Sequence, residues 1–169
     1  MPEFSDLGSF MVHFAASVRA VDIATHKALD KAATIIEKDA KNRIGHYQEA
    51  EGPHPAWAPL ADSTIEERSR LGFTPDDPLL RTGKLRDSIQ SEIRTVANYD
   101  STQEAIIGSK LEVAEIQEFG TSRIPARPFL GPAAFANKDK IQNLLGEAVV
   151  KGLFSGGQVH EALGYDIDT

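Results

Sequence analysis

The feature that most restricts the fold is a long stretch, residues 18–44, in which apolar residues recur every three or four positions. Apolar residues at this spacing include Val18, Val21, Leu29, Ile36 and Ile44. Charged residues fill the positions between them, so the pattern predicts one long amphipathic helix. Its apolar stripe is rich in alanine, which allows another element to approach closely. Gly45 is a suitable end for this helix.

Shorter elements follow along the chain. Residues 63–66 have the form of a capping box, which predicts a helix that begins at Ser63 and ends at Gly72. Thr82 is expected to cap a brief helix over residues 83–88. Apolar and polar residues then alternate over 89–97, and a second strand is predicted over 104–108, so that 89–108 form a β-hairpin.

The last third of the chain begins with a helical turn or two over residues 111–118. Gly120 ends this helix, and a left-handed conformation is expected there. Pro125 and Pro128 force an extended backbone, and Phe129 is expected in the core because the segment enters a helix. That final helix is predicted from Pro132 to residue 153.

The order of these elements predicts an α+β fold, with a long N-terminal helix and a C-terminal helix packed on a small, mainly antiparallel sheet. We expect an N-terminal arm over residues 1–17, a single domain over 18–153 and a flexible acidic tail over 154–169. From Gln158 onward the tail has three acidic residues and no Lys or Arg. Such a tail is expected to be mobile unless a partner holds it.

Charge and composition exclude several classes of protein. The chain has 169 residues and a net charge of −7, which disfavours sequence-independent nucleic-acid binding by the whole surface. It has no cysteine, which excludes disulfides and thiolate chemistry. No apolar run approaches the roughly 18–20 residues of a membrane span, and the first residues lack the basic region of a signal peptide. We therefore expect a protein of the cytosol or of a virion, with no membrane partner.

Searches for catalytic motifs give negative results. Gly83 and Lys84 resemble the end of a phosphate-binding loop, but Pro78 and Leu85 occupy positions where that motif needs Gly and Ser or Thr. Gly83 is therefore assigned a structural role. His46 and His54 flank Glu51 on a loop, but nothing in their spacing fixes a third metal ligand. We expect no enzyme activity, no metal and no cofactor.

One local concentration of positive charge stands out in this acidic chain. Its members are Arg81, Lys84, Arg86 and Arg94, with Arg123 and Arg127. These cations would suit DNA phosphates. The favoured alternative is that they pair with Glu112, Glu115 and Glu118, in the same chain or across a subunit contact.

The only tryptophan, Trp57, lies in a stiff, proline-flanked stretch that includes Pro59 and Leu60. A rigid aromatic side chain in this setting is either an interface anchor or a staple that packs the loop onto the core. Both readings stay open at this stage. The full set of interface candidates is Trp57, Pro59, Leu60, Arg81, Lys84, Arg86, Glu118, Arg123 and Arg127.

Four short sequence motifs follow one another along the chain in a characteristic order. Residues 57–60 read Trp-Ala-Pro-Leu, 81–89 read Arg-Thr-Gly-Lys-Leu-Arg-Asp-Ser-Ile, 118–121 read Glu-Phe-Gly-Thr and 125–130 read Pro-Ala-Arg-Pro-Phe-Leu. This succession resembles the tail-completion and neck proteins, or head–tail joining and virion morphogenesis proteins, of long-tailed bacteriophages. Minor tail protein Z of lambda-like phages is a similar protein. The chain departs from its relatives at Gln117, where histidine is frequent, and in a longer extension after residue 153.

The resemblance implies a structural protein of the phage neck or tail, made in the host bacterial cytoplasm. Such proteins form a ring, commonly of six copies, between a portal-side connector or head-completion protein and the tail terminator or tail tube. The ring completes the tail and joins it to the DNA-filled head, and the genome passes through its channel without sequence-specific binding. The alternatives are a tail terminator or minor tail subunit, a small DNA-binding protein that uses residues 81–94, and, with no motif behind it, a hydrolase.

Overall fold

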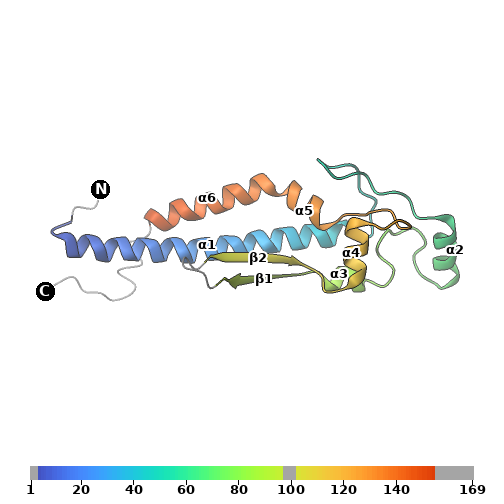
Figure 1. The fold of residues 1–169 in the computed structure, drawn as a ribbon, viewed down its shortest axis with the longest axis horizontal. Helices are drawn as coiled ribbons and strands as arrows, with labels where there is room; N and C mark the ends of the chain where they lie inside the picture. The colour runs from blue at the N-terminus through green and yellow to red at the C-terminus, as the bar shows by residue number, and fades with distance from the viewer. Residues whose placement is uncertain (1–3, 97–101, 155–169) are drawn as a thin grey trace. The chain divides into compact units, whose positions relative to one another are not determined.

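The computed structural model describes residues 4–96 and 102–154. The elements in chain order are α1 (Leu7–Arg43), α2 (Asp62–Arg70), α3 (Lys84–Ser88), β1 (Gln90–Thr95), β2 (Gln103–Gly108), α4 (Glu112–Phe119), α5 (Leu130–Ala136) and α6 (Lys138–Phe154). Figure 1 labels them along the chain. The expected α+β class is confirmed, with a long N-terminal helix, a two-stranded antiparallel sheet and a C-terminal helix.

Contacts divide the chain into two units. One consists of residues 1–31 and 140–169, and the other consists of residues 32–139. Helix α1 runs through both, so its N-terminal part belongs to the first unit and its C-terminal part to the second. The arm, domain and tail expected from the sequence are a different division of the chain, and that division stays a prediction.

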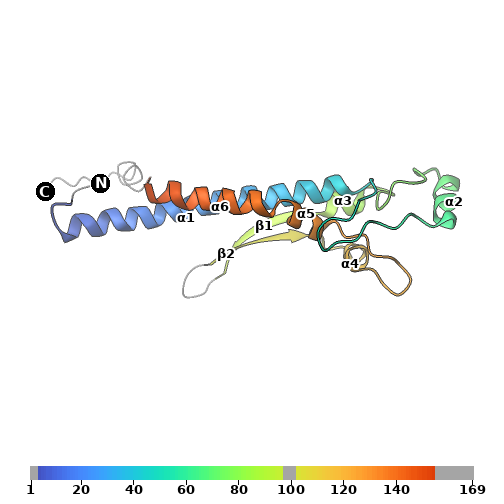
Figure 2. The ribbon, with the colours of Figure 1, turned by 90° about the horizontal axis from the view of Figure 1, so that it is seen from above.

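In the first unit, α6 packs against the N-terminal part of α1 through small residues. Ala16, Ala20, Ala148 and Gly152 are all buried. A Cβ atom built on Gly152 would lie 2.5 Å from the Cα of Val21, so only glycine allows this approach. Figures 1 and 2 both show the two helices side by side and antiparallel.

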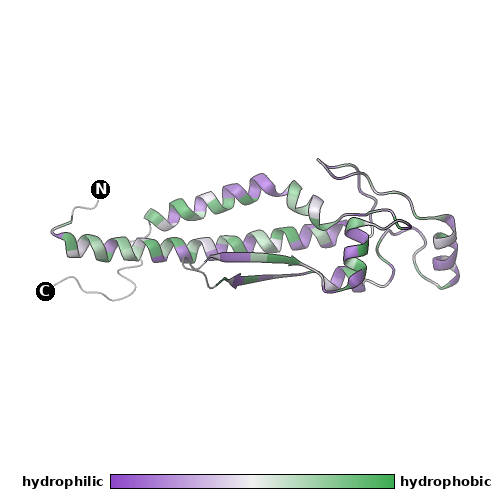
Figure 3. Ribbon diagram, in the orientation of Figure 1, coloured by the Kyte–Doolittle hydropathy of each residue, from purple (hydrophilic) through white to green (hydrophobic). Residues whose placement is uncertain are grey.

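The same part of α1 begins earlier and is more apolar than we expected. The helix starts at Leu7, within the segment expected to be an arm. Phe10, Met11, Phe14 and other large apolar side chains are exposed along it. Figure 3 shows hydrophobic residues along this part of the ribbon. By length and composition alone, α1 qualifies as a membrane span, with a mean hydropathy of 1.2 over 18 residues. This corrects the expectation that no segment would reach that limit, although helices of soluble proteins and signal sequences have the same properties.

The second unit contains a compact core built from widely separated segments. Its buried members are Ala40, Ile44, Trp57, Leu85, Ile89, Ala114, Phe129 and Ala133. Phe129 and Ile89 are fully buried, which confirms the expected core position of Phe129. Trp57 is 6% exposed, and its indole Nε1 donates a hydrogen bond of 2.9 Å to the carbonyl oxygen of Pro128. Trp57 therefore packs its loop onto the core, which is the second of the two readings above.

The predicted hairpin is present. Strands β1 and β2 pair in antiparallel register, with Gln90 opposite Gly108 and Thr95 opposite Gln103. Side chains along β1 alternate between half-buried and exposed over most of the strand, as the sequence pattern indicated. On the half-buried side, the hydroxyl of Ser91 donates a hydrogen bond of 2.5 Å to the carboxylate of Glu37 on α1. This bond joins the hairpin to the C-terminal part of α1.

Helix ends differ from the predictions in three places. Helix α2 begins at Asp62 with Ala61 at its N-cap and no side-chain cap, so the capping box at Ser63 was wrong. Likewise, Gly83 and not Thr82 is the N-cap of α3. The expected single C-terminal helix is two helices, α5 and α6, which meet at Asn137.

Gly120 ends α4 with φ +73° and ψ −180°, a conformation close to glycine-only, and not in the left-handed helical region we expected. A Cβ atom there would lie 2.8 Å from the backbone nitrogen of Ala126 and 2.9 Å from the carbonyl oxygen of Ile124. We predict that Gly120→Ala and Gly120→Val each lower the free energy of unfolding by about 2 kcal/mol or more, measured by urea denaturation. Gly146→Ala is the control, because nothing lies within 4 Å of a Cβ at that exposed helical position. That variant is expected to be neutral or slightly stabilising.

The burial of Trp57 gives a second prediction. Trp57→Ala removes a large buried ring and is expected to lower the free energy of unfolding of the isolated chain by about 3–5 kcal/mol. Phe119→Ala is the matched control, because Phe119 is 78% exposed and its loss should change stability little. Thermal and urea unfolding of both variants provide the measurement. A Trp57→Ala chain that unfolds like the parent would contradict the packing role.

Candidate functional site

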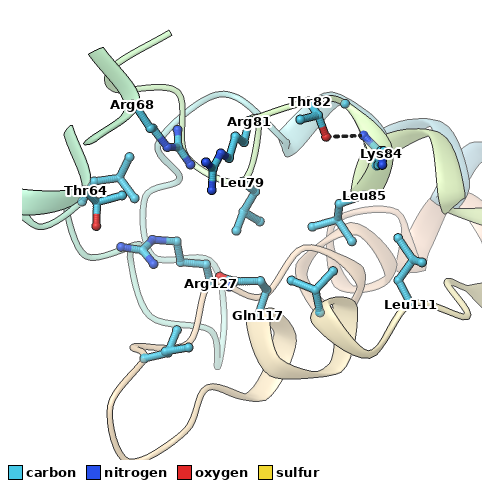
Figure 4. Close-up of a pocket in the computed structure, with 14 residues that line it drawn as sticks. Thr64, Arg68, Leu79, Arg81, Thr82, Lys84, Leu85, Leu111, Gln117 and Arg127 are labelled. Carbon is cyan, nitrogen blue, oxygen red and sulfur yellow. Dashed lines mark hydrogen bonds between the residues drawn. The ribbon is translucent and has the colours of Figure 1, made fainter. Parts of the chain in front are cut away.

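The second unit contains a pocket of about 560 Å³ where several predicted residues meet. Leu60, Arg81, Gly83, Lys84 and Arg127 all line it, although they come from segments far apart in the sequence. Figure 4 shows Arg68, Arg81 and Arg127 on one side of the view, and Lys84, Leu85 and Leu111 on the other. The pocket lies within the size range of small-ligand sites, roughly 300–1,000 Å³.

Arg127 is the most firmly fixed of the basic residues. Its side chain is 6% exposed, and its Nε and Nη2 atoms donate hydrogen bonds of 3.1 and 2.9 Å to the carbonyl oxygen of Ala58. Nη2 also donates to the carbonyl oxygen of Pro59 at 3.0 Å. Burial lowers the pKa of Arg127 from its ordinary value, and the positive charge of Arg68 lowers it further. An arginine nevertheless stays charged at neutral pH.

A second buried arginine comes from α2. Arg68 is 8% exposed, and its Nη1 atom donates a hydrogen bond of 2.6 Å to the carbonyl oxygen of Asp77. Arg68 was not among the interface candidates selected from the sequence, because it stands outside the basic strip over 81–94. It lies one helical turn after Thr64, which also lines the pocket, and this spacing was the available indication.

Among the residues that the structure describes, no acidic residue lines this pocket. Within residues 4–96 and 102–154, no carboxylate lies within 4 Å of the charged groups of Arg68, Lys84 or Arg127. Arg81 has a partner, Glu67, at 3.4 Å, but both side chains are about half exposed. Charged side chains are rarely buried without a charged partner. The pocket is therefore positively charged and suited to an anionic group.

The rest of the wall is mainly apolar, with Thr64, Thr82 and Gln117 as its uncharged polar members. Its apolar members are Leu60, Leu79, Leu85, Leu111, Val113 and Ile124. Leu79 has φ +63°, a left-handed conformation that is costly for a residue with a side chain. Gln117 also lines the pocket, and its buried Oε1 atom has no hydrogen-bond partner in the part of the chain that is described. The wall thus offers mainly apolar contacts, and it includes a glutamine whose buried carbonyl oxygen is unpaired among the described residues.

Glu118, an interface candidate, is used inside the chain. Its carboxylate accepts hydrogen bonds from the backbone N–H groups of Phe129, Leu130 and Gly131, at 2.8, 3.0 and 2.7 Å. These groups lie at the start of α5, where unpaired N–H groups attract a negative charge. In the described part of the chain, the expected pairing of the basic strip with Glu118 is therefore not seen.

The remaining basic candidates have other acidic partners or lie apart from the pocket. Arg86 pairs with Asp87 at 3.1 Å, and Arg94 pairs with Glu104 at 3.0 Å. Arg123 is exposed and lies outside the pocket wall. Of the other candidates, Trp57 lies in the core and Pro59 supplies a carbonyl oxygen to Arg127. An interface role for each of these residues stays a prediction.

The loop that carries His46, Glu51 and His54 is held by contacts within the chain. Glu51 and His54 exchange backbone hydrogen bonds of 2.9 and 3.0 Å, and the Glu51 carboxylate pairs with Arg43 at 2.8 Å. The His54 ring packs edge-on against Phe135, with 6.3 Å between ring centres. Among the described residues, no group of three or more potential ligands could hold a metal ion.

Comparison with known proteins identifies the family of the chain. Residues 13–150, most of the sequence, match the phage virion morphogenesis family. The chain belongs to this family. No curated protein and no solved structure matches it significantly.

Membership of the phage virion morphogenesis family places the chain in the structure or assembly of the phage particle, and its location is the virion. The matched region contains the whole second unit and therefore the basic pocket and the Glu118 contacts. The resemblance stated from the sequence is confirmed at this level.

The Glu118 contacts give a prediction for the Glu-Phe-Gly-Thr sequence over residues 118–121. Glu118→Ala removes three charge-assisted hydrogen bonds and leaves their N–H groups unpaired, so the free energy of unfolding should fall by about 2–3 kcal/mol. Glu115→Ala is the matched control, because Glu115 is exposed on the same helix. Urea denaturation measures both. Equal stability of the two variants would contradict this role.

Proposed function

We propose that the protein forms a ring in the phage neck, commonly of six copies, which completes the tail and joins it to the DNA-filled head. The family match over residues 13–150 is the observation that carries this proposal. The order of phrases described above favours tail completion within the family, with a likeness to minor tail protein Z. The partners would be a portal-side connector or head-completion protein and the tail terminator or tail tube.

The chemistry of the surface agrees with this role. A ring needs two different, complementary faces on each subunit. The basic pocket in the second unit and the exposed apolar side chains in the first supply surfaces of different character. We propose that proteins cover these surfaces, with no membrane partner.

Passage of the genome requires a channel that does not hold DNA. The net charge of −7 suits this, because a strongly basic channel would retain DNA phosphates. Arg81, Arg86 and Arg94 each have an acidic partner at 3.0–3.4 Å, which reduces their attraction for DNA. This charge balance also disfavours the alternative of a small DNA-binding protein that uses residues 81–94. We further propose that the chain is not an enzyme and uses no cofactor.

A tail terminator or minor tail subunit is the closest alternative, since both belong to the same stack of rings. Position in the particle separates them. Electron microscopy of intact virions should place the proposed protein between the connector and the tail terminator. A position below the terminator would support the minor tail subunit instead.

The proposed ring is tested by measuring the mass of the oligomer. Native mass spectrometry or light scattering should give a closed oligomer of the full chain, either alone or mixed with the connector. A phage that lacks the chain should produce separate heads and tails. A chain that stays monomeric with its connector, or mutant particles that join and infect normally, would contradict the proposal. Retention of the isolated chain on DNA with a steep salt dependence would favour the DNA-binding alternative.

A further inference from the structure

The basic pocket contains more positive charge than the described part of the chain neutralises. Arg68 and Arg127 are both more than nine-tenths buried, and carbonyl oxygens are their hydrogen-bond acceptors. Lys84 adds a third charge at the wall, again with no carboxylate within 4 Å among residues 4–96 and 102–154. Desolvated cations that repel each other favour the arrival of a carboxylate. The charges therefore specify an anionic ligand.

Gln117 specifies a second property of that ligand. Gln117 lines the pocket, and its buried Oε1 atom has no partner among the described residues, so a ligand that reaches this atom must carry an N–H or O–H donor. Leucine, valine and isoleucine side chains form most of the uncharged part of the wall. A ligand that combines carboxylates, N–H donors and apolar side chains is an acidic peptide segment.

The chain carries such a segment at residues 158–169. Its sequence, Gln-Val-His-Glu-Ala-Leu-Gly-Tyr-Asp-Ile-Asp-Thr, has three acidic residues, no Lys or Arg, and apolar residues between the acids. We infer that residues 158–169 of a neighbouring copy bind in the basic pocket. The carboxylates meet the arginines, a backbone N–H meets Gln117, and apolar side chains meet the leucines. The pocket volume accommodates a short part of the segment, so a few side chains provide the contacts.

We favour a neighbouring copy as the source of the segment because the proposed ring needs a contact between two different parts of adjacent copies. When each copy gives its segment to the next and receives one from the previous copy, the contact is head-to-tail, and such a contact forms a ring when the rotation between copies closes. The choice of a neighbouring copy rests on the proposed function. The inference that the pocket binds an acidic segment does not rest on it, so the ligand and its source are tested in separate experiments.

The first experiment tests the pocket and its ligand. The receptor is the full chain with Glu161→Gln, Asp166→Asn and Asp168→Asn, so that its own segment does not compete. A fluorescent peptide with the native sequence 158–169 should bind this receptor in an anisotropy titration, and added salt should weaken binding. A peptide with the same three amide substitutions should bind at least about tenfold more weakly.

A charge reversal in the pocket provides the matched comparison. Lys84 is exposed at the wall, so Lys84→Glu should fold and should weaken peptide binding by about tenfold or more. Lys140→Glu makes the same change on exposed α6, outside the pocket, and should leave binding unchanged. Absence of binding to the receptor, or equal binding by the two variants, would overturn the assignment of the pocket.

The second experiment identifies the source of the segment. The chain has no cysteine, so introduced cysteines react without competition. A full chain with Lys84→Cys is mixed with a separately labelled chain with Asp168→Cys and oxidised. A disulfide-linked mixed dimer is expected, and Lys140→Cys in place of Lys84→Cys should give far less.

The outcomes separate the two proposals. The control is a chain that carries both Lys84→Cys and Asp168→Cys. If its disulfide forms only within one chain, the inference that the segment comes from a neighbouring copy is overturned. Binding of the peptide would then still support the acidic ligand. If the chain proves not to be a neck ring, peptide binding and its loss in Lys84→Glu are still expected. Absence of peptide binding in a chain that does form rings would overturn the inference alone.

Discussion

The carboxylate of Glu118 holds together the part of the second unit on which the rest depends. It gathers three backbone N–H groups at the start of α5, and so fixes where the chain turns from the extended segment into that helix. The same segment receives the indole hydrogen bond of Trp57 at Pro128, and the backbone N–H of Arg127 donates to the Gln117 carbonyl oxygen at 2.7 Å. The core and the pocket wall therefore share one short piece of backbone.

The sequence predicted the elements whose pattern is local. The alternation over β1 and β2 gave the hairpin, and the two prolines before Phe129 gave an extended segment that enters a helix. The first turns of α1 were missed because the apolar residues of 7–17 show no clear period and large apolar side chains stay exposed there. The break at Asn137 was missed because it depends on a distant residue. The Asn137 amide donates to the carboxylate of Asp39 and to the carbonyl of Ala133.

The candidate site was predicted in part, and the reason lies in burial. Arg81, Lys84 and Arg127 were selected as cations near one another in sequence, and the fold brings them to one pocket. Sequence could not show that Arg127 is buried against carbonyl oxygens, nor that Arg68 approaches it from α2. The sequence also suggested Glu118 as an ionic partner of the basic residues, whereas its carboxylate accepts hydrogen bonds from backbone N–H groups at the start of α5. Which charges stay unpaired is decided by tertiary contacts.

Leu79 shows how the chain balances stability against the shape of its pocket. A left-handed backbone at a leucine costs on the order of 1 kcal/mol or more, and glycine would adopt it freely. Glycine would also remove an apolar side chain from the wall. The chain thus has an unfavourable backbone torsion at Leu79, where glycine would cost less conformational free energy. The Leu79 side chain therefore stays in the pocket wall at a cost in folding stability that glycine would avoid.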